Sequence, residues 1–231
     1  MQQSEEKDFY KEAYNFVKAH SATKNDFIDR FGRGEFTESE FLRFSEEFYH
    51  FTREWPSILS TLLVNTPDED DAANLTTILV SELGDMDPKK RHELLYRKYL
   101  RSIGLHPEEL VKKKQLKTTK AWLDGMRNYF AGNHFEALGA EFGLENMAIP
   151  MWDKILSGFE KWLKNHPKYS GADIDYFTFH RELEIHHEEA MENVLGGHKD
   201  DPSVQKSFLK GIDGILNLER DFWIGLSDNR N

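Results

Sequence analysis

The feature that most constrains the fold of this chain is the helical spacing of its apolar residues. Phe41, Phe44, Phe48, Phe51 and Trp55 recur at steps of three and four residues, which return to one face of an α-helix. Val, Ile and Thr do not form the short alternating runs that are typical of β-strands. We therefore expect an all-α protein in which this aromatic stripe lies mostly in the core.

Signals for helix starts and ends divide the chain. Thr37-Glu-Ser-Glu40 matches a capping box and opens the aromatic helix. Thr66-Pro67 and Asp87-Pro88 each place Pro at the first position of a further helix, and these two helices are expected to end near Gly84 and Gly104. The other helices are expected over residues 5–20 and 24–31, after His106-Pro107, and over residues 116–131, 133–148, 151–165, 173–195 and 202–226.

The length and the short loops indicate one domain. A chain of 231 residues suffices for a single large core, and no internal repeat is visible. The pattern predicts one domain over residues 1–231, a bundle of about eight to ten helices with its core at about residues 30–226.

Composition excludes several classes of protein. The net charge of −11 argues against a nucleic-acid partner, because phosphate binding needs clustered Lys and Arg, and the one basic run, residues 112–120, is expected to connect two helices. The chain has no cysteine, so disulfides, thiolate nucleophiles and Cys-ligated metals are excluded. Residues 1–8 lack the apolar core of a signal peptide, and no apolar stretch approaches the roughly 20 residues that span a bilayer. We expect a cytoplasmic protein with no membrane partner.

The most informative motif for function is the triplet His180, Glu184 and His187. Residues at i, i+4 and i+7 share one face of a helix, so two imidazoles and a carboxylate would point the same way. Mixed nitrogen and oxygen ligation suits iron or manganese. A solvent-exposed polar face would give the same spacing, so the triplet alone does not decide between the two interpretations.

Two candidate ligands flank a break between helices. Glu82 ends one helix and His92 lies in the next, and Gly84 between them can adopt a positive φ. The two side chains would converge only if the break folds back on itself. From spacing alone, surface positions for both are the favoured interpretation.

Glu145 is a candidate because of its neighbours. Leu144, Met147 and Ile149 indicate a helix buried on most faces, where a carboxylate is costly unless it is paired or bound to metal. Glu141, one turn earlier on the same face, is the competing candidate.

In chain order, these residues resemble the ligand pattern of the haem-oxygenase-like diiron oxidases, the group that includes the CADD-like proteins. That pattern is a Glu and a His seven to ten residues apart, a lone Glu, and His-x3-Asp-x2-His. Residues 81–95 resemble the family's Glu-x-Gly…Asp-Pro…His-x-x-Leu segment, residues 145–150 its Glu-x-x-x-(Ile/Val)-Pro segment, and residues 48–56 its aromatic helix before a Pro. The likeness covers about residues 30–225. It departs at Glu184, where the family usually has Asp.

The resemblance implies a haem-oxygenase-like helical bundle that binds two iron ions, or one iron and one manganese, with O2 as co-substrate. The implied metal ligands and catalytic residues are Glu82, His92, Glu145, His180, Glu184 and His187. The implied substrate is a small amino acid or fatty acid that undergoes C–C cleavage, decarboxylation with desaturation or N-oxygenation. Part of the aromatic stripe would line the substrate cavity. The extra methylene of Glu184 would alter how the two metals are bridged, and a homodimer is one of the oligomeric states that the sequence allows.

Other interpretations stay open. A non-redox helical module of the same fold would bind a small molecule or serve cofactor biosynthesis, although a thiaminase-like version lacks its Cys. A haem oxygenase would have only His20 as an early proximal ligand. A ferroxidase or storage bundle could pair Glu47-x-x-His50 with Glu184-x-x-His187, but the first copy lies on the aromatic helix, which favours coincidence.

Three further features are interpreted as structure. His186 points away from His187 and is expected at the surface or behind the ligands, Glu188, Glu189 and Glu192 are expected to form a solvated acidic face, and His134 and Glu136 have no partner at useful spacing.

Overall fold

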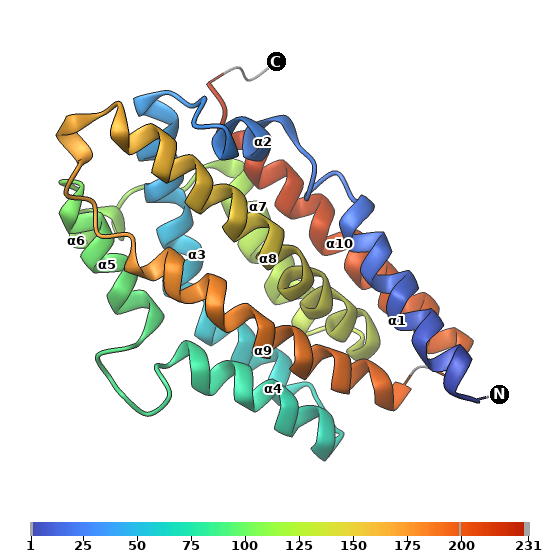
Figure 1. The fold of residues 1–231 in the computed structure, drawn as a ribbon. Coiled ribbons are helices and arrows are strands. Elements are labelled where there is room, and N and C mark those ends of the chain that lie inside the picture. The colour runs from blue at the N-terminus through green and yellow to red at the C-terminus, as the bar shows by residue number, and fades with distance from the viewer. Residues whose placement is uncertain (1, 199, 229–231) are drawn as a thin grey trace.

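The computed structural model describes residues 2–198 and 200–228, with side chains for residues 9–183, 186–198 and 200–228. Within the described residues the chain forms ten α-helices, one 3-10 helix and no strand (Figure 1), which confirms the all-α prediction. The elements are α1 (Gln2–Ala19), α2 (Asp26–Gly32), α3 (Glu38–Val64), α4 (Glu69–Glu82), α5 (His92–Ser102), α6 (Pro107–Leu110), α7 (Lys117–Phe130), α8 (His134–Lys164), η1 (Pro167–Tyr169), α9 (Asp175–His198) and α10 (Pro202–Gly225).

The long helix α8 lies at the centre of the bundle. It packs against α10, α9 and α2, while α4 lies along the other side of α9 (Figure 1). The core between these helices is rich in aromatic rings. Phe44, for example, lies 5.1 to 6.2 Å from the rings of Phe31, Phe159 and Trp223. Such pairs stabilise the bundle beyond the burial of their area.

The predicted capping box is present. The Glu40 amide donates to Thr37 Oγ1 at 3.1 Å and the Thr37 amide donates to Glu40 Oε2 at 3.0 Å, so α3 begins where the sequence predicts. Phe41 and Phe44 of the aromatic stripe are fully buried in the core, as expected.

The predicted starts of the next two helices are wrong. The Asp68 carboxylate accepts hydrogen bonds from the Asp70 and Asp71 amides, so Asp68 caps α4 and Pro67 lies before the helix. Asp87 accepts from the Lys89 amide in a tight turn instead of capping a helix. α5 therefore begins only at His92.

The two helices predicted over residues 133–148 and 151–165 are one helix. α8 runs through Pro150 without ending. Proline removes one amide and normally breaks a helix, but Met147, Met151 and Trp152 are buried on both sides of Pro150. Packing of the flanking turns therefore holds the helical path.

No helix among the described residues is long and apolar enough to cross a membrane.

Candidate metal centre

Glu82 and His92 meet across the break between α4 and α5. Gly84, Asp85 and Met86 all have positive φ, at 93°, 50° and 68°, and fold the chain back sharply. The Nδ1 atom of His92 lies 2.7 Å from Glu82 Oε2, and the two residues are 1% and 6% exposed. The surface positions that spacing alone favours are therefore wrong, and the fold brings the pair together.

His180 completes a group of three on the neighbouring helix α9. Its ring lies 4.3 Å from the ring of His92, and one potential ligand atom from each of Glu82, His92 and His180 lies within 4.8 Å of the others. The Nδ1–H of His180 donates to the Tyr176 carbonyl at 2.7 Å, which leaves Nε2 with a lone pair. Two imidazoles and a carboxylate thus converge at a buried point.

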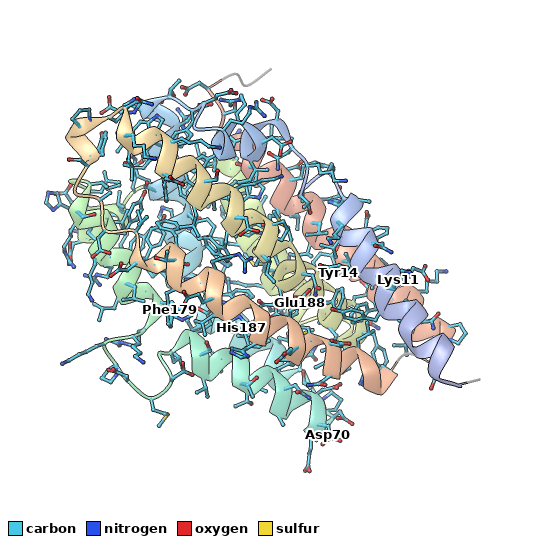
Figure 2. All side chains as sticks on the ribbon, in the orientation of Figure 1. Lys11, Tyr14, Asp70, Phe179, His187 and Glu188 are labelled. Carbon is cyan, nitrogen blue, oxygen red and sulfur yellow. The ribbon has the colours of Figure 1, made fainter. Side chains whose placement is uncertain are left out.

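Glu145 and His187 form a second pair beside this group. The His187 Nδ1 atom lies 3.2 Å from Glu145 Oε2, and both residues are buried between α8 and α9. His187 lies about midway along α9 (Figure 2). Glu141, the competing candidate, is fully buried as well, and the Glu145 carboxylate accepts a hydrogen bond from the His187 ring.

Glu184 lies in α9 between the two histidines, and its side chain is outside the described residues. A ligand role for Glu184 stays a prediction.

The electrostatics of the site suit a cation. Burial raises the pKa of Glu82, but the charge and hydrogen bond of His92 oppose this and lower it to about 2. Burial, together with His92, lowers the pKa of His180 to about 3. His187 also lowers the pKa of Glu82, so the second pair lies within electrostatic range of the first group. At neutral pH the carboxylate is ionised and His180 is neutral, which are the forms that bind metal.

One buried nitrogen atom tests whether these residues fit a metal ion. The His92 Nε2 atom is shielded from solvent and has no hydrogen-bond partner among the described residues. An orphaned buried nitrogen is costly unless an ion, water or ligand satisfies it. Three imidazoles and two carboxylates around such a nitrogen fit iron or manganese.

A cavity of about 50 Å³ adjoins the site. Glu82, Glu145 and His180 contribute to its wall. The rest is largely aromatic, with Phe48, Phe51, Trp55, Trp122, Trp152 and Tyr176. Part of the aromatic stripe therefore lines a cavity, and its use for substrate stays a prediction.

Glu219 is a cavity residue that the sequence analysis missed. It lies on α10, is buried and lines the same cavity. Burial raises its pKa to about 8, although the Trp223 indole lowers it in part. The sequence could have indicated Glu219, because it shares a helix face with Ile215, Phe222 and Trp223 and a carboxyl group is unusual on such an apolar face.

Other histidines and acids lie apart from the site. Glu47 Oε2 accepts from the Leu116 amide at 3.1 Å and so anchors the start of α7, in keeping with coincidence as the origin of its ferritin-like spacing. His186 is exposed, as expected. Glu188, predicted to be solvated, is half-buried toward α1 (Figure 2), where burial and the charge of Glu188 raise the pKa of Tyr10.

Comparison with known proteins identifies the class. Residues 42–220 match the family described as iron-containing redox enzymes, and the chain belongs to that family. It is 24% identical over 216 residues to a 4-chloro-allylglycine synthase from Streptantibioticus cattleyicolor, covering 92% of this chain and 80% of that protein.

Two solved structures share the fold. A CADD-like protein of unknown function from Nostoc punctiforme superposes with a TM-score of 0.77 at 17% identity, covering 96% of this chain and 97% of that one. A domain of unknown function with a haem-oxygenase-like fold from Shewanella denitrificans has a TM-score of 0.71 at 18% identity, covering 98% and 91%. The expected haem-oxygenase-like bundle is thus confirmed.

Proposed function

We propose that this protein is an O2-dependent oxidoreductase with a non-haem dinuclear centre, Fe/Fe or Fe/Mn, that oxidises a small amino-acid-like substrate. The observation that carries the proposal is the convergence of two histidine–carboxylate pairs and a third histidine beside one aromatic cavity. Membership of the iron-containing redox enzymes supports the choice of metal.

In this proposal the six residues predicted from the sequence hold the two ions, which, when bound, would supply the electrons that reduce O2. Glu82 and His92 hold one another in position through their 2.7 Å contact, as do Glu145 and His187. The Tyr176 carbonyl fixes the tautomer of His180 so that its Nε2 is free to ligate. The aromatic wall excludes water and positions the substrate.

Two observations favour an amino-acid-like substrate over a fatty acid. The curated relative is named for the synthesis of an amino acid. The cavity combines aromatic walls with the Glu219 carboxyl group. An ammonium group is attracted by aromatic faces and can donate a hydrogen bond to the carboxyl oxygen, while its apolar body fits the walls. The reaction outcome, whether cleavage, decarboxylation or N-oxygenation, would be set by the shape of this cavity.

Metal stoichiometry and O2 consumption test the proposal. Anaerobic loading with Fe(II) should give about two ions per chain, and His187→Ala should lose at least one of them together with substrate-dependent O2 uptake. His186→Ala is the matched control, because His186 is the exposed neighbour on the same helix. It should keep both ions and full O2 uptake.

The alternatives give different results. A non-redox binding module would bind no iron in either form. A ferroxidase would consume O2 with Fe(II) alone, and no amino acid or fatty acid would accelerate the reaction. Unchanged iron stoichiometry in His187→Ala would contradict the assigned ligands.

A further inference from the structure

A second group of metal-binding side chains lies away from the cavity, where three helix ends meet. Asp71 lies in the first turn of α4, His134 is the first residue of α8 and His198 is the last residue of α9. Asp71 Oδ2 lies 2.6 Å from His198 Nε2 and 3.6 Å from His134 Nε2. One potential ligand atom from each residue lies within 4.8 Å of the other two.

This group is separate from the candidate iron site. Asp71 precedes Glu82 by 11 residues in α4, and His198 follows His187 by 11 residues in α9. At 1.5 Å per residue, both intervals are roughly 16 Å along the helix. The start of α4, marked by Asp70 in Figure 2, lies at the end of the bundle away from the α4–α5 turn.

The group has the character of an incomplete site. Asp71 is buried, and among the described side chains its ion-pair partners are the two imidazoles, with no Lys or Arg. Both ring nitrogens of His134 are shielded from solvent yet have no hydrogen-bond partner among the described residues. A buried carboxylate with no Lys or Arg beside it indicates that a cation belongs at this point. An imidazole whose two nitrogens lack hydrogen-bond partners indicates the same.

We propose that Asp71, His134 and His198 bind a divalent transition-metal cation of the Zn²⁺ class. Two imidazole nitrogens and one carboxylate oxygen suit such borderline cations, whereas Mg²⁺ and Ca²⁺ prefer oxygen alone. The His134 and His198 side chains are 16% and 23% exposed, so water can complete the coordination. Binding at His198 Nε2 requires that the proton between Asp71 and His198 leave this nitrogen, either for Nδ1 of the same ring or for solvent.

The site would fasten the two helices that carry most of the candidate iron ligands. α4 ends at Glu82, and α9 contains His180 and His187. An ion at their far ends would tie both to the start of α8 without touching the cavity. Its role is therefore structural, and the inference does not depend on the proposed oxidase activity.

Zn²⁺ titration of the chelator-treated protein tests the inference. Isothermal titration calorimetry and metal analysis should find a Zn²⁺ ion that is lost in His134→Gln and retained in His187→Ala, in addition to the Zn²⁺ that the histidines and carboxylates of the candidate iron site take up. His134→Gln leaves the 2.6 Å contact between Asp71 and His198 in place, so the fold should persist. Its Zn²⁺ affinity should fall by more than the roughly 10–100-fold that outer-shell changes cost.

Two further variants sharpen the test. His106→Gln, at an exposed histidine before α6, should bind Zn²⁺ like the wild type. Asp71→Asn keeps a hydrogen-bond acceptor for His198 but removes the charge, so it should also lose the ion. Equal Zn²⁺ stoichiometry and affinity in wild type, His134→Gln and Asp71→Asn would overturn the inference.

Discussion

The ionisation of Glu219 should make the stability of the protein depend on pH between about 4.5 and 8. Its pKa is about 8 in the folded protein and near the ordinary 4.5 in the unfolded chain. Between these values the folded state holds a proton that the unfolded state has lost, so stability falls as pH rises through this window. Glu219→Gln removes the titration and should stabilise the metal-free protein at pH 9 relative to pH 5, by on the order of a few kcal/mol.

Urea unfolding of both proteins at pH 5 and pH 9 measures the difference, because other titrating groups are common to both. Glu160→Gln is the control. Glu160 is exposed and its pKa is lowered by Lys164, so that change should have a small effect of the opposite sign. Parallel pH profiles for wild type and Glu219→Gln would show that the carboxyl group is hydrated in the folded protein.

The sequence could indicate the site residues that share one helix or that follow the ligand order of a known family. His180 and His187 could be paired because their spacing on one helix is fixed. The contact of Glu82 with His92 was not predictable from spacing, because it depends on three consecutive positive φ values in the turn. The meeting of Asp71 with His134 and His198 was also hidden, since these residues are 63 and 127 positions from Asp71 in the sequence and only the packed helices bring them together.

Close contact between α8 and α10 depends on glycine. A Cβ at Gly211 would lie 2.0 Å from the Glu136 carbonyl oxygen, and one at Gly139 would lie 2.0 Å from that of Phe208. These neighbours are backbone atoms and can move only if the helices separate. Gly211→Ala should therefore destabilise the protein by about 1–3 kcal/mol or more, measured by urea unfolding.

The matched control is Gly196→Ala in α9, where nothing lies within 4 Å of the added Cβ. Alanine in an open helical position should stabilise by about 0.5–1 kcal/mol. If both substitutions stabilised the protein, the close approach of α8 and α10 would not exist in solution.

Sequence signals predicted the start of a helix correctly where local hydrogen bonds determine that start. The capping box at Thr37 fixed the start of α3, because both of its hydrogen bonds are local. Proline signals failed at Pro67, Pro88 and Pro150, where a competing cap, a tight turn and the packing of the flanking turns prevailed. Tertiary packing, which the local sequence does not contain, decided the last of these cases.

For the whole molecule, the candidate iron site brings together side chains from four helices of the bundle. The side chains that converge come from α4, α5, α8 and α9. The weakest connection among them is the turn between α4 and α5. Asp85 and Met86 hold positive φ values that cost energy in residues other than glycine, and Met86 is 90% exposed. Few apolar contacts therefore hold residues 83–91 in place.

Metal binding should order this turn. Without metal, the His92 Nε2 atom is buried with no hydrogen-bond partner among the described residues, and opening the turn would hydrate it. A bound ion removes that advantage, because opening then also breaks metal–ligand bonds. Hydrogen exchange at residues 80–92 should slow on anaerobic addition of Fe(II), and the unfolding temperature should rise. Exchange in α10, which supplies none of the proposed ligands, is the internal reference and should change little. Equal protection of residues 80–92 with and without Fe(II) would mean that the turn is rigid by itself and that the metal does not couple α4 to α5.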